Sequence, residues 1–381
     1  GVSQTEDWVR IGGDQLVPRD GAYDVRVTAE LWETHYIDHV ALMAVDHPAG
    51  TEVFVDERFS PRAVALGVEG VTNLRPLGRA EDDTGRDVSE LVAALDGRYL
   101  ATFEHGRYQG IAADHFVTFD MPAAGDGRLL LVAQGWVYPT DSSINVAVGQ
   151  GSHAGPRGLS LEAQDGSGRW VVVSPDLGFP AGKSKTMLID LDVVAAAGLQ
   201  GVRKVRLRTN LEVYWDRLAF ADPAPEAELR TTRLGATSAV LRYRGFSETT
   251  EERRAPDTPH YGRIANVTQR WRDLTGLYTR FGDVGPLLQA VDDRYVIMNA
   301  GDELQLRFPV PPPPPDGWTR DFVLVGDGWN KDGDFNTGHS ATVLPLPSHD
   351  NPAYEGAASA IDLAGDPVFR RHAADWDEFH T

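Results

Sequence analysis

The chain has 381 residues, a formal net charge of −20 at pH 7 and no cysteine. Its acidity opposes nucleic acid binding, because phosphate recognition needs clustered Lys and Arg. The absence of cysteine excludes disulfides, thiolate catalysis and cysteine-ligated metal centres. No apolar run reaches the roughly 18 residues of a membrane-spanning helix, so we expect no membrane insertion.

The chain contains 39 glycines and 24 prolines, which separate many short runs of Val, Leu, Thr and Tyr. This pattern is typical of strands joined by turns. We predict a mainly β protein with two jelly-roll-like β-sandwich modules and an additional β-rich C-terminal region. The predicted domains are an N-terminal β-rich module at residues 1–122, a jelly-roll-like β-sandwich at residues 123–222, and a C-terminal region with a polyproline spacer at residues 223–381.

In the first half of the chain, residues 23–29 alternate apolar and polar side chains, which predicts a strand, and residues 52–56 form another short run. Residues 85–95 have apolar side chains at helical spacing and predict a short helix. Further strands are predicted at residues 129–133, 145–148, 169–173 and 213–220.

A short internal similarity links two of these regions. Residues 36–42 (YIDHVAL) match residues 214–220 (YWDRLAF) as Tyr, apolar, Asp, basic, apolar, Ala, apolar. Each follows a strand rich in Val and Arg. A match of this length arises by chance as readily as by duplication, so related and unrelated modules both stay open.

The last third contains predicted strands at residues 241–246, 295–298 and 304–308. Five consecutive prolines at residues 311–315 disfavour helix and central strand, and they predict a stiff polyproline spacer. One more predicted strand, at residues 321–325, leads into residues 326–337 (GDGWNKDGDFNT).

Residues 326–337 are the strongest metal candidate, because calcium takes about six to eight oxygen ligands and alternating Asp and Asn can supply several. The segment lacks the glutamate that closes an EF-hand loop, so its geometry would differ. The alternative is a loop whose side chains bond nearby backbone N–H groups. The candidate ligands are Asp327, Asn330, Asp332, Asp334 and Asn336.

Asp38 and Asp216 occupy the same place in the internal similarity. Each is a candidate metal ligand or sugar contact. The alternative is an Asp at a strand bend, or one that forms an ion pair with a neighbouring Arg.

Four aromatic residues, Trp136, Tyr138, Trp170 and Trp215, are candidates for a platform that binds a sugar ring, and Asp141 is a candidate ligand-binding residue. The alternative is that the aromatic side chains are buried in a β-sandwich core.

Several longer motifs lie at residues 44–48, 178–187, 278–284, 301–304, 317–322, 328–332 and 342–347. They resemble the C-terminal region of large bacterial proteins that carry FG-GAP propeller repeats and an ASPIC/UnbV domain (the cartilage-acidic-protein-like group) or TPR repeats. The resemblance implies a secreted or surface setting and a calcium-rich parent, and it carries no activity. That family has Asp where this chain has Asn330, which would weaken one metal ligand.

Together these features favour a non-catalytic extracellular or cell-surface binding module, for carbohydrate or another surface ligand, with structural calcium. One alternative is a self-assembling extracellular structural protein, in which strand edges or the proline segment join copies. A second alternative is an enzyme: a glycosidase, which needs two carboxylates facing one pocket, or a metal-dependent hydrolase.

Overall fold

The computed structural model describes residues 2–31, 33–60, 66–122, 127–199, 201–225, 228–251, 257–268, 274–354 and 362–381. The chain is 47% strand and 10% helix, with several antiparallel sheets, one of which curls into a half-barrel. The prediction of a mainly β chain is confirmed, and the jelly-roll description stays a prediction. Within the described residues, no helix has the length and apolar character needed to cross a membrane.

Two antiparallel sheets, here named A and B, form the first sheet pair, and alternate apolar residues of their strands fill a shared core. Sheet A has the order β1 (Val2–Ile11), β21 (Trp318–Asp332), β3 (Glu33–Pro48) and β14 (Arg230–Gly235), and β19 (Val296–Met298) also pairs with β3. Sheet B has the order β18 (Gly282–Asp283), β15 (Ser238–Tyr243), β20 (Asp302–Pro309) and β2 (Ala22–Thr28).

Sheets C and D form the second sheet pair around a separate core. Sheet C has the order β11 (Lys185–Asp190), β8 (Leu130–Val137), β13 (Val213–Pro223), β5 (Val68–Pro76) and β4 (Glu52–Val55). Sheet D has the order β10 (Trp170–Ser174), β9 (Ser160–Gln164), β12 (Lys204–Leu211), β7 (Ile111–Asp120) and β6 (Ala80–Asp82).

The remaining elements are short. A separate hairpin joins β16 (Phe246–Thr250) to β17 (Thr258–Asn266). The helices are α1 (Ser142–Gln150), α2 (Asp192–Ala196), α3 (Pro367–Arg371) and α4 (Ala373–Phe379), with single 3-10 turns η1 (Ser89–Leu91), η3 (Gly285–Leu287) and η4 (Leu363–Gly365).

Two predictions of secondary structure from the sequence were wrong. The strand predicted at residues 145–148 is part of helix α1, because Asp141 accepts a hydrogen bond from the Ile144 N–H and so caps the first turn. The helix predicted at residues 85–95 is reduced to the single turn η1, which begins where Asp87 accepts hydrogen bonds from the N–H and hydroxyl of Ser89.

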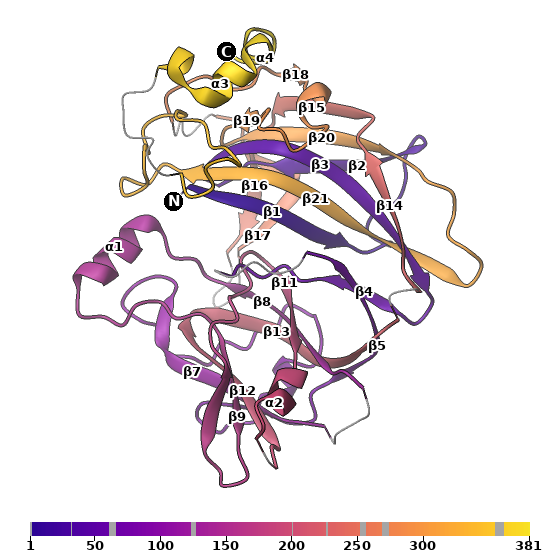
Figure 1. Cartoon of the computed structure of the whole chain (residues 1–381), viewed down its shortest axis with the longest axis vertical. Coiled ribbons are helices and arrows are strands. Elements are labelled where there is room, and N and C mark those ends of the chain that lie inside the picture. Colours follow the sequence, from indigo (N-terminus) through magenta and orange to yellow (C-terminus); the bar gives the residue numbers. More distant parts are fainter. Residues whose placement is uncertain are drawn as a thin grey trace.

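The two sheet pairs lie against each other, with sheets A and C on the inside (Figure 1). The outer face of sheet A contributes Met43 and Val323 to a small apolar cluster, and β4 contributes Val53 and Val55. The predicted boundary near residue 122 falls between β7 and β8, which lie in facing sheets. The predicted boundary near residue 222 falls at the end of β13.

The two sheet pairs share a common strand order over most of their strands, and β4, β9 and β10 of the second pair lie outside it. Sheet A reads β1-β21-β3-β14 where sheet C reads β11-β8-β13-β5, and sheet B contains β2-β20-β15 where sheet D contains β12-β7-β6. The strands β20 and β21 are therefore equivalent to β7 and β8, and β2 and β3 are equivalent to β12 and β13. In the first pair the chain order is permuted, because β1 to β3 come from the N-terminal part and their partners come from beyond residue 230.

The internal sequence similarity falls at equivalent places in this arrangement. Asp38 and Asp216 are each the extra residue of a β-bulge, opposite β21 and β8 respectively. A second similarity precedes β19 and β7: residues 87–100 (DVSELVAALDGRYL) match residues 283–296 (DVGPLLQAVDDRYV), and each segment contains a 3-10 turn. In the first of these segments the N–H groups of Asp96 and Gly97 donate to Asp216. In the second, the N–H groups of Asp292 and Asp293 donate to Asp38.

The C-terminal segment, residues 333–354 and 362–381, covers one end of sheet A. It contributes Val343, Leu346, Val368 and Trp376 to a cluster with aromatic residues of the sheet. Lys331, at the end of β21, is fully buried beneath this segment, and its amine donates to Tyr354 Oη at 2.9 Å. Burial lowers the Lys331 pKa to about 7.

Replacing Lys331 with Met should remove a pH-dependent component of stability. Between pH 7 and about 10.4 the unfolded chain binds a proton that the folded chain does not, so this lysine makes stability rise with pH. Urea unfolding from pH 6.5 to 9.5 should therefore show a rise in the wild type that the variant lacks, by up to about 1.4 kcal/mol per pH unit. The exposed Lys183→Met is the control. Parallel pH profiles for wild type and Lys331→Met would contradict this assignment.

A polar contact also joins the sheet pairs. Asp334, after β21, accepts hydrogen bonds from the Ser143 N–H at 3.2 Å and the Ser143 hydroxyl at 2.9 Å, in the first turn of α1. Asn336 donates to the same hydroxyl at 2.8 Å. A carboxylate at a helix N-terminus satisfies unpaired backbone N–H groups and interacts favourably with the helix dipole.

Removing this carboxylate by Asp334→Ala should lower the free energy of unfolding by about 1 to 2 kcal/mol. A double-mutant cycle with Ser143→Ala, measured by urea unfolding, should show coupling between the two positions. The exposed Asp316→Ala should leave stability nearly unchanged. Additive effects of the two substitutions would show that the contact contributes nothing.

Candidate functional site

The five candidate ligands predicted in the Asp/Asn turn contact different parts of the structure. Strand β21 continues to Asp332, so the first three candidate ligands lie on a strand and not in a turn. Asn330 donates to Glu33 at 3.1 Å, and Asp332 accepts a hydrogen bond from the Thr337 hydroxyl. Asp334 and Asn336 contact α1, as described above. Asp327 is the member that joins a different group.

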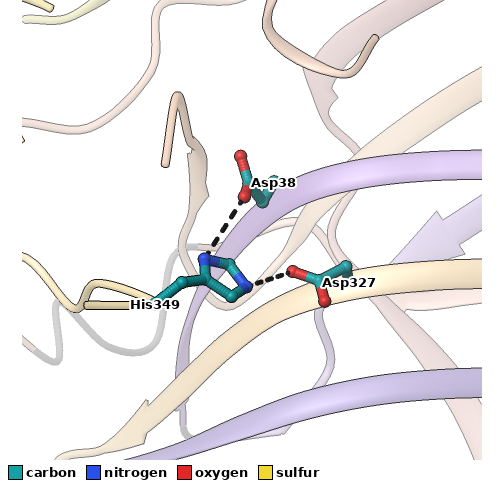
Figure 2. A group of neighbouring side chains, drawn as sticks. All are labelled: Asp38, Asp327 and His349. Carbon is teal, nitrogen blue, oxygen red and sulfur yellow. Dashed lines mark hydrogen bonds and ion pairs between the residues drawn. The ribbon is translucent and has the colours of Figure 1, made fainter. Parts of the chain in front are cut away.

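That group consists of Asp38, Asp327 and His349 (Figure 2). His349 Nε2 lies 2.9 Å from Asp327 Oδ1, and His349 Nδ1 lies 3.7 Å from Asp38 Oδ2. The bulge in β3 places Asp38 beside Asp327 of β21, and the C-terminal segment brings His349 to them. One potential ligand atom from each residue lies within 4.8 Å of the others. Asp38 and Asp327 were both candidate ligands, and the structure brings them together.

Asp38 is the most buried member of the group, with an exposed fraction of 0%. Its Oδ2 accepts hydrogen bonds from the N–H groups of Asp292 and Asp293, both at 3.0 Å. Its Oδ1 is buried and has no hydrogen-bond partner. Burial raises the Asp38 pKa to about 7, although the two backbone hydrogen bonds oppose the shift.

A second carboxylate orients His349 from its other side. Asp293 Oδ1 lies 2.6 Å from His349 Nδ1, and Asp293 also accepts hydrogen bonds from Tyr295 and Arg371. Burial acts to raise the Asp293 pKa, but hydrogen bonds from the His349 side chain and backbone N–H, from Tyr295 and from Ser348 outweigh it and lower the pKa. Burial acts to lower the His349 pKa, but Asp293 and Asp327 outweigh it and raise the pKa.

Burial also raises the pKa of Asp327, despite the nearby His349. Within the described part of the chain, Asp38, Asp327 and His349 form the one group of three or more acidic and His side chains close enough to share an ion. Two carboxylates and an imidazole can hold a divalent cation.

His349 and Asp293 were missed by reasoning from sequence. His349 follows Asp327 by 22 residues, which matches no metal-ligand spacing, and Asp293 belongs to an acidic pair of a kind common in acidic chains. The available signal was the second internal similarity, in which Asp293 stands where the other copy has Gly97.

Asp216, the other candidate from the internal similarity, belongs to no such group among the residues that the structure describes. Its carboxylate accepts hydrogen bonds from the N–H groups of Asp96 and Gly97 at 3.0 to 3.2 Å. Burial raises its pKa, and the two backbone hydrogen bonds oppose the shift.

The predicted aromatic platform is divided between the two faces of sheet C. Trp136 lies directly opposite Tyr214 across the strand pair, with ring centroids 5.1 Å apart, and Tyr138 lies 5.3 Å from Trp136. Trp215 points to the opposite face and is buried in the core of the second sheet pair. Asp141 caps α1. The structure therefore brings together Trp136 and Tyr138 and separates Trp215 from them. Trp170 lies on β10 of sheet D, apart from the other three.

Polar and aromatic groups border Trp136 and Tyr138. The ring of Tyr99 lies 6.5 Å from Tyr214, at a near-perpendicular angle. Glu212 is buried, and its carboxylate lies 3.4 Å from Nδ1 of His105, whose side chain is 47% exposed. We refer to Trp136, Tyr138, Tyr99, Tyr214 and Glu212 as the aromatic surface.

No protein-family model matches the chain, and neither curated proteins nor solved structures gave a match. The resemblance to the C-terminal region of FG-GAP and ASPIC/UnbV proteins therefore stays a prediction.

Proposed function

We propose that this chain is a non-catalytic carbohydrate-binding protein that acts outside the cell or at its surface, with two jelly-roll-like modules. Its ligand site is the aromatic surface of the second sheet pair. The observation that carries this proposal is that three aromatic residues are buried in the first sheet pair, whereas two of the three equivalent residues in the second, Tyr99 and Trp136, are partly exposed and the third, Tyr214, is buried.

In the first sheet pair the chain covers these residues itself. Tyr36, Tyr295 and Trp329 are at most 2% exposed, beneath the C-terminal segment. The Tyr36 hydroxyl donates to the Val343 carbonyl at 2.7 Å, and the Tyr295 hydroxyl donates to the Pro347 carbonyl at 2.9 Å.

In the second sheet pair the equivalent residues are Tyr214, Tyr99 and Trp136. The ring geometry is preserved: Tyr36 and Tyr295 lie 5.8 Å apart at 81°, and Tyr214 and Tyr99 lie 6.5 Å apart at 89°. Trp136 and Tyr99 are nevertheless only half-buried, and the neighbouring Tyr138 is 38% exposed.

Partly exposed aromatic rings beside an exposed imidazole fit the two sides of a sugar. The apolar face of a pyranose ring packs on aromatic rings, and its hydroxyl groups need hydrogen-bond partners. His105, whose side chain is 47% exposed and contacts the buried Glu212, can supply such a partner at the edge of the aromatic surface.

The proposal predicts that Trp136→Ala and Tyr138→Ala each weaken carbohydrate binding roughly tenfold, since one aromatic contact contributes about 1.5 kcal/mol. A glycan array identifies the ligand, and isothermal titration calorimetry then compares the variants. Tyr261→Ala is the matched control, because Tyr261 is 62% exposed on the β16–β17 hairpin.

Near-ultraviolet circular dichroism shows whether each variant keeps its native packing. A folded wild-type protein that binds no glycan on the array would contradict the proposal. Equal affinities for wild type and a folded Trp136→Ala would move the site away from the aromatic surface.

A further inference from the structure

The two sheet pairs repeat one local arrangement around a bulge Asp. In each, the Asp accepts two backbone hydrogen bonds from a neighbouring turn: Asp38 from Asp292 and Asp293, and Asp216 from Asp96 and Gly97. A glycine opposite the bulge, Gly328 or Gly135, approaches the facing backbone so closely that a Cβ would lie 2.2 or 2.4 Å from a carbonyl oxygen. The arrangement that both sheet pairs share is thus part of the fold. Residues that differ between the two sheet pairs around Asp38 and Asp216 indicate where one pair has a further role.

The first difference is in the turn. Gly97 has a φ of 79° and Asp293 has a φ of 66°, so both backbones are left-handed. Glycine adopts this conformation without cost, whereas Asp does so at some expense. The first sheet pair has Asp at this position, and its carboxylate binds His349.

The second difference is in the strand opposite the bulge. By register, Asp327 is equivalent to Gln134, and His39 is equivalent to Arg217. The Gln134 amide oxygen accepts a hydrogen bond from Arg217 Nε at 2.7 Å. In the second sheet pair the neutral Gln134 is therefore paired with a cation of the neighbouring strand. Asp327 instead faces His349, which comes from the C-terminal segment.

The first sheet pair therefore has two additional carboxylates, Asp293 and Asp327, where the second has Gly97 and Gln134. Arg371 binds Asp293 on the side away from the group. Asp38 remains fully buried, with Oδ1 unpartnered. Buried acidic groups require paired positive charge or a bound metal.

We propose that Asp38, Asp327 and His349 bind a divalent transition-metal ion of the zinc class, and that the equivalent site of the second sheet pair, held by Arg217 and Gln134, binds none. His349 Nδ1 lies 2.6 Å from Asp293 Oδ1, which leaves Nε2, 2.9 Å from Asp327 Oδ1, as the ligand atom. Asp38 Oδ2 lies 3.7 Å from Nδ1 and would shift toward Nε2 to share the ion. A carboxylate on the far nitrogen of a ligating imidazole is the usual arrangement around such ions. This proposal does not depend on carbohydrate binding by the aromatic surface.

The donor set decides between metal classes. An imidazole with two carboxylates suits zinc and related ions, whereas calcium takes about six to eight oxygens and seldom a nitrogen. Two ligand atoms that are each about 2.0 to 2.2 Å from one zinc ion lie roughly 3 Å or slightly more apart. The 2.9 Å between His349 Nε2 and Asp327 Oδ1 is close to this separation. The sequence-based choice of calcium is thus replaced by zinc in this proposal.

The ion would join β3, β21 and the C-terminal segment, because its three ligands come from these parts. Its removal should loosen residues 343–349 and partly expose Trp329, whose ring lies 5.9 Å from His349. The second sheet pair should not respond to metal.

The test uses the full chain without an affinity tag, stripped with a chelator and titrated with Zn²⁺ by isothermal titration calorimetry. The wild type should bind one ion, and Asp38→Asn and His349→Gln should each weaken binding at least about 100-fold. Asp293→Asn should weaken it about 10- to 100-fold through the orientation of His349. Asp216→Asn, the equivalent change in the second sheet pair, should bind Zn²⁺ as the wild type does.

Ca²⁺ and Mn²⁺ are titrated in parallel, and circular dichroism confirms that each variant is folded. An Asn at position 38 keeps an oxygen that can accept the two backbone hydrogen bonds, so Asp38→Asn tests the ion with little disturbance of the bulge. Wild-type protein that binds no Zn²⁺ would overturn the proposal and leave an ion-paired network of Asp and His. Tighter binding of Ca²⁺ than of Zn²⁺ would overturn the metal class. Equal losses in Asp38→Asn and Asp216→Asn would overturn the location.

Discussion

The pairing of β3 with β21 is the interaction on which the other features of the first sheet pair depend. Its register runs from Trp318 opposite Pro48 to Asp332 opposite Glu33, so it joins segments that are far apart along the chain. One face of this ladder packs on sheet B, and the other packs partly on β4 and partly on the C-terminal segment. The bulge within it places Asp38 beside Asp327. Without this non-local pairing, the apolar faces and the acidic group would have no fixed partners.

The sequence predicted the β character of the chain well, because alternation of apolar and polar residues reports directly on strands with one buried face. It did not predict which strands pair, since no local pattern joins residues 33–48 to residues 318–332. Asp38 and Asp327 were therefore selected by unrelated arguments and assigned to separate sites. His349 carried no pattern of its own, because its role arises only when the C-terminal segment packs on the sheet.

The period of two along a strand explains the outcome for the aromatic candidates. Trp136 and Tyr138 are two residues apart and share a face, whereas Trp215 pairs with Gly135 and points into the core.

The strand predicted at residues 145–148 illustrates another limit. A run of Val and Ala is compatible with helix or strand. Helix is favoured here because Asp141 caps the first turn and Asp334, from the other sheet pair, accepts a hydrogen bond from the Ser143 N–H. The segment at residues 326–337 therefore has mainly structural contacts: of its five candidate ligands, only Asp327 belongs to the group of Asp38, Asp327 and His349.

The permuted strand order has a consequence for synthesis of the chain on the ribosome. All strands of the second sheet pair lie between residues 52 and 223, so the chain can complete this unit as soon as β13 has emerged. Strands β1 to β3 are made first but must wait for β20 and β21, which are more than 250 residues further along. Until β14 emerges β3 has no sheet partner, and until β21 emerges its other edge stays open to wrong pairing. The N-terminal strands are thus made early but are among the last of the described strands to gain all their partners.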